Sequence, residues 1–187
     1  MKALCTLAVL SIFLALPLAA QQQDKSPQKL VSPAAYTYIP NTLRAALDKR
    51  GCQLPQLDQY DKGLGGDAEH VNAVSGHFLT STQTDWAALC IVNDHPRVVV
   101  VWGVKGKPAC GDDITTGWPL EQSFAHEAGG GLFLASASKK TILDYRKFFG
   151  DANKNPVTHD GINVGDEKAS LIYYCDGKTW LQLQGDD

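Results

Sequence analysis

The chain has 187 residues and a formal net charge of −3, with 44% hydrophobic, 20% charged and 9% aromatic residues. These values are typical of a single globular domain and exclude a disordered, collagen-like or coiled-coil chain. The slightly acidic balance also argues against a broad surface for binding nucleic acid.

Residues 1–20 have the pattern of a secretory signal peptide. Lys2 gives a positive start, Ala3–Leu16 is an uncharged apolar run, and Ala19-Ala20 offers small residues for cleavage. The run is shorter than a typical membrane span. We therefore expect cleavage near Ala20, no membrane span in the mature chain, and a secreted or periplasmic location.

The segment 21–38 is polar and contains proline, which predicts a linker before one globular domain over residues 39–187. The domain is expected to begin with a helix over residues 41–50. Asn41 is expected to be its N-cap, and Gly51 suits the position after its last turn.

Four cysteines remain after removal of the signal peptide: Cys52, Cys90, Cys110 and Cys175. An even count in an exported chain indicates disulfide bonds, and no C-x-x-C spacing supports a zinc site or a redox centre. Three pairings are possible. We favour Cys52–Cys90 with Cys110–Cys175; the alternative is that one pair is free and buried.

Strands are expected from residue 71 onward, over Val71–Leu79, Asp85–Val92 and Arg97–Val104. The second and third contain the continuous apolar runs AALCIV and VVVVW. Such runs predict strands that are covered on both faces or lie in the middle of a sheet.

Residues 105–130 are rich in Gly, Pro, Asp and Thr and are expected to be mostly loop. A strand is expected over Gly131–Ala137. It is followed by a helix over Lys139–Phe149 with Ser138 as its N-cap.

The segment Asp151–Val164 is expected to be another loop. Strands over Lys168–Cys175 and Lys178–Leu183 are expected to form a terminal hairpin around Asp176-Gly177. The sequence therefore predicts a disulfide-stabilised α+β domain with two helices and a mainly antiparallel sheet of about six strands.

Two segments begin like metal sites but lack required ligands. His126-Glu127 starts the H-E-x-x-H zinc motif, but Gly130 stands where the second histidine belongs. Asp151-x-Asn153-x-Asn155 starts a calcium loop, but Ile162 replaces the final acidic ligand. We expect no bound metal and no cofactor, since the glycine patterns of nucleotide-binding loops are also missing.

A catalytic site would need several polar residues brought together by the fold. His77, Asp85, His159 and Asp160 are the candidates, as a base and its orienting acid. No G-x-S-x-G nucleophile motif accompanies them. Trp118, in a predicted loop, is the candidate residue for binding a glycan or a peptide.

The segment from Gly76-His77-Phe78 through Thr84–Leu89 to Val98–Gly103 resembles one blade of the FG-GAP/VCBS type. In that pattern G-D-F precedes an acidic calcium loop, and D-L-A-V begins the next strand. Here His77 replaces the first aspartate, and residues 79–84 carry no carboxylate. The resemblance therefore implies a strand pair without the ion.

The mature chain is also similar to a group of uncharacterised bacterial exported proteins. The similarity lies in the order of short segments: Leu43–Leu47, Gly51-Cys52, Pro55-Gln56, Thr84–Ala87, His159–Gly161 and Trp180-Leu181. It implies export and a stand-alone domain, and no particular reaction.

We therefore expect an exported, non-catalytic binding domain in the bacterial periplasm or envelope, with a protein or glycan partner held by loops 59–70 and 105–130. The alternative is a hydrolase that uses the four histidine and aspartate candidates. A third possibility is a structural domain without a ligand, which predicts neither a pocket nor an exposed aromatic patch.

Overall fold

The computed structural model describes residues 30–55, 72–93, 95–103, 110–115, 133–150, 155–165 and 169–185. In chain order the described elements are β1 (Leu30–Val31), η1 (Pro33–Ala35, a 3-10 helix), α1 (Asn41–Asp48), β2 (Leu54–Pro55), β3 (Ala73–Gly76), β4 (Asp85–Val92), β5 (His95–Val101), β6 (Asp113–Thr115), β7 (Phe133–Ala137), α3 (Lys139–Phe148), β8 (Gly161–Gly165), β9 (Ser170–Cys175) and β10 (Trp180–Gln184). Neither of the described α-helices has the length and apolar character needed to cross a membrane. The predicted signal peptide lies outside the described residues.

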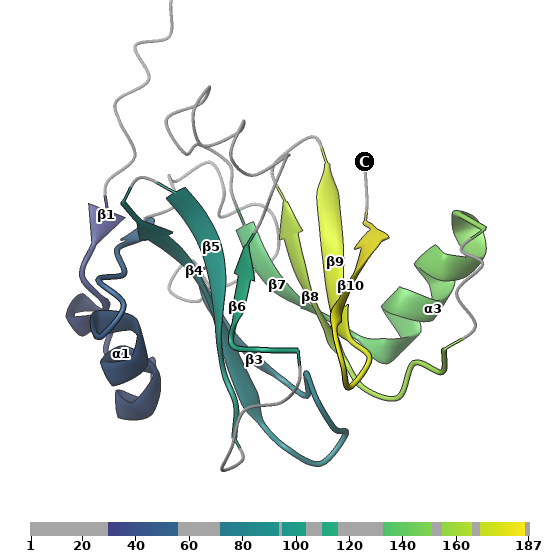
Figure 1. Cartoon of the computed structure of the whole chain (residues 1–187), viewed down its shortest axis with the longest axis horizontal. Helices are drawn as coiled ribbons and strands as arrows, with labels where there is room; N and C mark the ends of the chain where they lie inside the picture. Colours follow the sequence, from purple (N-terminus) through teal and green to yellow (C-terminus); the bar gives the residue numbers. More distant parts are fainter. Residues whose placement is uncertain are drawn as a thin grey trace, which may run out of the picture.

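The strands form two four-stranded antiparallel sheets and one short pair. The first sheet has the order β3-β4-β5-β6, the second has the order β7-β8-β9-β10, and β1 pairs with β2. Figure 1 shows α1 beyond the first sheet and α3 beyond the second. The described part of the chain thus has four layers, in the order helix, sheet, sheet, helix.

Apolar side chains from both sheets fill the space between them. The buried members of this central cluster are Phe78, Ala87, Leu89, Val98, Val100, Ile114, Leu134, Ile162, Val164 and Tyr173. Phe78 is the largest of the fully buried side chains. The two sheets therefore share one core.

The intervening positions on the same strands face the helices. Ala88 and Cys90 of β4 pack with Leu43 and Leu47 of α1, and Ile172 of β9 packs in the cluster under α3. Alternate residues of a strand point to opposite faces, so a strand between two apolar layers needs apolar residues at nearly every position. The prediction of strands covered on both faces is confirmed for β4 and β5.

The start of α3 agrees with the sequence prediction, whereas the start of α1 differs from it. The Ser138 hydroxyl accepts a hydrogen bond from Thr141 N at 3.1 Å, as expected for the N-cap of α3. In α1, however, Asn41 is the first helical residue and Pro40 holds the cap position. Pro40 suits this position because its φ of −59° is close to the value that its ring imposes, and its carbonyl accepts from Arg44 N.

The number of strands and sheets also differs from the sequence prediction. The described residues contain ten strands in three sheets, instead of about six strands in one sheet. β1, β2 and β6 have only two or three residues each, too few for a recognisable alternation of side chains. β1 and η1 fall within the segment 21–38, which was assigned to a linker.

β8 begins within the segment Asp151–Val164, for which the sequence predicts a loop, and ends one residue beyond it. Its glycines indicate a turn in the sequence, but in the structure they allow close backbone contacts. A Cβ on Gly161 would lie 2.8 Å from Tyr173 O, and one on Gly165 would lie 2.4 Å from Ala169 O. Glycine is needed here because the neighbouring chain approaches too closely for a side chain.

The four described cysteines form the two pairs that are favoured from the sequence. Cys52 pairs with Cys90 and Cys110 with Cys175, at Cα–Cα distances of 5.4 and 6.0 Å. Both distances fall in the usual range for a disulfide. The first pair ties the chain after α1 to β4, and the second ties the first sheet to the second.

An aromatic pair adds to the contact between the sheets. Trp102, just after β5, and Trp180, the first residue of β10, stack with ring centroids 5.7 Å apart. The Trp102 indole N–H donates to Gly111 O at 3.2 Å, beside Cys110. The start of β10 is thus held against the first sheet next to the second disulfide.

Candidate functional site

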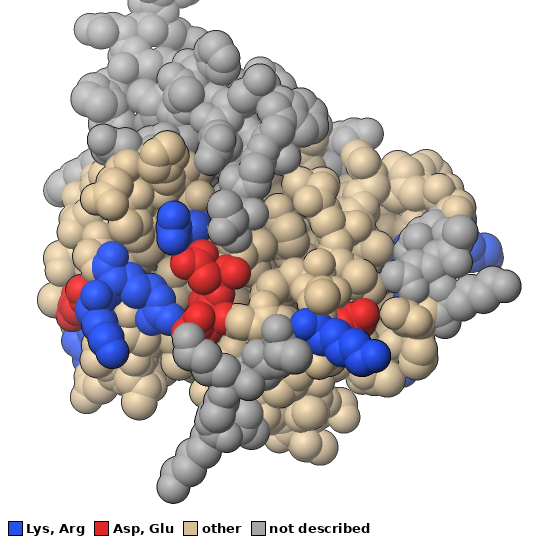
Figure 2. All heavy atoms as spheres, viewed as in Figure 1, with Lys and Arg blue, Asp and Glu red and all other residues tan. Residues whose placement is uncertain are grey.

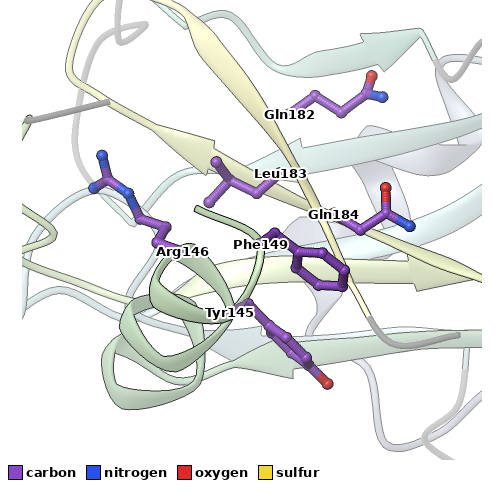
Figure 3. A pocket seen from close by; sticks show the side chains of 6 residues that line it. All are labelled: Tyr145, Arg146, Phe149, Gln182, Leu183 and Gln184. Atoms are coloured by element: carbon purple, nitrogen blue, oxygen red, sulfur yellow. The ribbon is translucent and has the colours of Figure 1, made fainter. Parts of the chain in front are cut away.

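A groove opens between the end of α3 and the edge strand β10 (Figure 3). Its volume is about 170 Å³. Three residues of the α3 end and three of β10 line it: Tyr145, Arg146, Phe149, Gln182, Leu183 and Gln184. The lining mixes aromatic, aliphatic, amide and guanidinium groups, so it offers both apolar contacts and hydrogen-bonding groups.

The aromatic wall of the groove follows from residue spacing in α3. Ile142, Tyr145 and Phe149 recur at intervals of three and four residues, so they share one helix face. Ile142 is fully buried under the helix. One and two turns later, the rings of Tyr145 and Phe149 lie in the groove, with centroids 6.1 Å apart (Figure 3).

Phe148 lies off this helix face and is 81% exposed, the most among the exposed large apolar residues of the described chain. Its ring meets that of Phe149 edge-on at a centroid distance of 4.9 Å, and Phe149 is itself 41% exposed. We call Phe148 and Phe149 the aromatic tip. Exposed apolar groups that gather beside a groove are typical of interaction sites.

The helix that carries the aromatic tip is basic. It has four basic residues and one acidic residue: Lys139, Lys140, Asp144, Arg146 and Lys147. The Lys140 ammonium lies 2.6 Å from the Asp144 carboxylate, and this hydrogen bond and charge raise the pKa of Lys140. Arg146 and Lys147 in the last turn leave an excess of positive charge at the groove.

Other parts of the surface are mixed in charge. On the face shown in Figure 2, basic and acidic side chains lie next to one another. Two ion pairs lie around β6. Arg50 pairs with Asp112 at 2.6 Å, and Arg97 pairs with Asp113 at 3.0 Å. The basic character of α3 therefore differs from the paired charges around β6.

The structure brings together two of the four candidate catalytic residues. His77 Nδ1 lies 3.4 Å from Asp160 Oδ2, and the His77 side chain is 47% exposed. The Asp160 carboxylate also accepts from the backbone N–H of His77 and of Lys139, the first residue of α3. Among the described residues, no serine, threonine or cysteine side chain forms a hydrogen bond with His77.

Asp85 has different partners. Its carboxylate is fully buried and accepts from Phe78 N at 3.0 Å, from Gly103 N at 2.9 Å and from the Gln83 side chain. These bonds join the loop before β4 to the chain after β5. The position of Asp85 is that of an acceptor that holds two loops together.

His159 is buried beside the second sheet. Its ring stacks on Tyr174 with centroids 4.4 Å apart, and its Nδ1 lies 2.8 Å from Asp160 O. The described contacts therefore do not join the four side chains into one cluster. The Asp85 carboxylate bonds to loop amides, and the His159 ring contacts Tyr174 and the backbone carbonyl of Asp160, not its carboxylate.

The predicted binding residue Trp118 lies outside the described residues. The same is true of loop 59–70 and of most of loop 105–130, of which residues 110–115 are described. Within the described part of the chain, no group of three or more His, Cys, Asp or Glu side chains is arranged to hold a metal ion.

The sequence alone does not predict the groove. Helical spacing of apolar residues predicts α3, but it does not tell which turn of the helix leaves the core. One signal was present: Leu143 and Phe148 lie off the face that contains Ile142, so the helix has more apolar residues than one buried face requires.

No known protein family, curated protein or solved structure matches this chain. The function proposed below therefore depends on the geometry and chemistry of the chain itself.

Proposed function

We propose that this protein is an exported, non-catalytic binding domain of the bacterial periplasm or envelope, with a protein or a glycan as its partner. The groove between α3 and β10, together with the aromatic tip, is the proposed binding site. Phe148 carries the proposal, because its ring is 81% exposed beside a groove. Burying a phenylalanine side chain under a partner is worth about 1.5–3 kcal/mol.

Export is supported by the composition of residues 1–20 and by the two disulfide pairs. Disulfides persist in oxidising compartments such as the bacterial periplasm. The Cys110–Cys175 pair also supports the proposed site, because it fixes β9, the neighbour of β10, to the first sheet. A rigid strand beside the groove lowers the entropy cost of binding.

The proposal is tested by retention of envelope components on the immobilised protein, purified after export. Phe148→Ser and Phe149→Ala change the aromatic tip, and Lys49→Ala, at the end of α1 on the other side of the fold, is the control. We expect at least one retained protein or glycan to fall by about tenfold or more with the tip variants only, as for loss of an interface anchor. Equal retention by all variants would contradict the proposal.

The contact between His77 and Asp160 favours a second candidate, a hydrolase with His77 as its base. Its test is turnover of nitrophenyl esters, phosphate esters and glycosides by the wild type, by His77→Ala and by His159→Ala. Under the binding proposal, all three proteins show the same background rate. Turnover that is lost in His77→Ala and kept in His159→Ala would favour the hydrolase.

A further inference from the structure

β10 is an edge strand of the second sheet, and its hydrogen-bonding pattern is defined at both ends. Asp176 N donates to Thr179 O at 3.1 Å, and Gly185 N donates to Ser170 O at 2.9 Å. In an antiparallel pair these contacts recur at every second residue, so Leu181 and Leu183 also point their backbone groups toward β9. The backbone groups of Trp180 and Gln182 then point away from β9.

The described residues contain no strand on this outer side of β10. The groove has β10 on one side and the end of α3 on the other. Outward backbone groups at strand spacing match another extended polypeptide, which offers N–H and C=O groups at the same spacing. A glycan chain lacks that regular pattern of amides.

The side chains around the groove indicate what the added strand would carry. Leu181 and Leu183 face the cluster under α3, and Tyr145 joins them there. Every second residue of an added strand would face this apolar side. The basic excess of α3, including exposed Lys147, favours a partner segment with a net negative charge.

The same charge argues against a second copy of this chain as the occupant. Pairing of two β10 strands about a twofold axis would bring the two basic α3 helices toward each other. Like charges across an interface oppose association. A partner with negative charge avoids this repulsion.

We propose that the groove between α3 and β10 binds an extended peptide segment of alternating apolar and acidic residues, which pairs with β10 as an additional strand. This inference rests on the proposed binding function and names the chemical class of its partner.

Defined peptides test the inference. The main probe is a fluorescent peptide of four Glu-Val repeats, which spans about 26 Å when extended and exceeds the length of β10. A Lys-Val peptide of equal length tests the charge. Glu-Val peptides N-methylated at every glutamate, or at every valine, test the backbone pairing. We expect the Glu-Val peptide to bind at least about tenfold more tightly than the Lys-Val peptide, and one N-methylated form to lose binding.

Substitution at Gln182 tests the strand itself. Gln182→Pro removes an N–H that points away from β9, a position where an edge strand tolerates proline. It should weaken Glu-Val binding by about tenfold, whereas Gln182→Ala keeps the N–H and should lose no more than about threefold. Lys147→Glu should weaken Glu-Val binding and strengthen Lys-Val binding. If Gln182→Pro does not fold, the fallback test is hydrogen exchange of the Gln182 amide in the wild type. The bound peptide should slow this exchange by about tenfold.

The outcomes separate this inference from the broader proposal. Unchanged binding of both N-methylated peptides, or unchanged exchange at Gln182, would overturn strand addition. Vesicles of equal parts phosphatidylglycerol and phosphatidylcholine, and peptidoglycan fragments, are the competing probes. Binding of either one that Phe148→Ser abolishes, without Glu-Val binding, would overturn the peptide inference and keep the binding proposal. No binding of any probe, together with equal retention by the tip variants, would overturn both.

Discussion

The Asp85 carboxylate is fully buried and accepts hydrogen bonds from the backbone N–H groups of Phe78 and Gly103. Both donors lie in loops, so neither has a strand partner to replace the carboxylate. A buried N–H without an acceptor destabilises the folded state. Asp85 therefore contributes to stability by holding these loops, although in the sequence it also fits a catalytic acid.

Replacing Asp85 with alanine should lower the free energy of unfolding by roughly 2–4 kcal/mol, because two backbone donors lose a charged acceptor. Asp85→Asn keeps one acceptor oxygen and should lose less. Urea denaturation followed by tryptophan fluorescence measures both variants. An alanine variant as stable as the wild type would contradict this role.

Asp176 provides a test of pH dependence. Backbone hydrogen bonds from Thr179 and Lys178 lower the pKa of Asp176 in the folded state. A lowered folded pKa stabilises the protein above the unfolded value of about 3.9, and the stabilisation disappears as the pH falls through the folded pKa.

We therefore expect Asp176→Ala to be less stable than the wild type at pH 7, with a difference that shrinks as the pH falls below about 4. Urea midpoints at several pH values measure it. Asp176→Asn, which keeps an acceptor oxygen but no charge, is the matched control, and its difference from Asp176→Ala should not depend on pH in this range. If the stability difference between the wild type and Asp176→Ala stays constant as the pH falls below about 4, the charge of Asp176 does not contribute to stability.

Single polar residues were the hardest to interpret from sequence. His77, Asp85, His159 and Asp160 share the chemistry of a catalytic cluster, and the sequence does not state their partners. The structure gives those partners: a backbone amide of α3 for Asp160, two loop amides for Asp85 and the Tyr174 ring for His159.

At the scale of elements, α3 both packs on the second sheet and lines the groove. Its sequence does not show which of its residues serve each purpose. Ile142 is fully buried, while its neighbour Leu143 is 44% exposed. The first residue attaches the helix to the second sheet, and the last turn carries the groove and the aromatic tip.

Ile142→Ala should lower the free energy of unfolding by about 2–4 kcal/mol because it leaves a cavity under the helix. Leu143→Ala, one residue away, should change it by less than about 1 kcal/mol because the side chain is already partly in water. Chemical denaturation of both variants makes the comparison. Similar losses for the two would mean that α3 packs through a different face.

The long elements were predictable and the short ones were not. β4 matches its predicted range of Asp85–Val92, and α3 begins at the predicted Lys139 after its Ser138 cap. Each has a distinctive apolar pattern and end signals within its own sequence. β1, β2 and β6 have only two or three residues each, too few for such a pattern, and β8 is bounded by glycines, which indicate a turn.

The four-layer arrangement depends on contacts that the composition alone does not reveal. The continuous apolar runs predict coverage on both faces of β4 and β5, but they do not show that one of the two covers is another sheet. The even number of cysteines after the predicted signal peptide and the predicted export favour disulfide bonds. In both bonds, a loop or the end of a helix is joined to a strand.

Exported protein should contain Cys52–Cys90 and Cys110–Cys175 and begin just after Ala20. Non-reducing peptide mapping and intact mass measurement check both points. Replacing Cys110 and Cys175 together with alanine should lower the free energy of unfolding by about 2–4 kcal/mol, because the bond restricts the unfolded chain. Free thiols at all four positions would contradict the framework.

The positions of the two disulfides have a consequence for the effect of proteolytic cleavage. Residues 56–71 lie between Cys52 and Cys90, and residues 116–132 lie between Cys110 and Cys175. Hydrolysis of one peptide bond in either stretch would therefore leave both fragments covalently attached through sulfur. Such a nicked molecule would migrate as one species until a reductant released the pieces, and the layers around the groove would stay together after the cut.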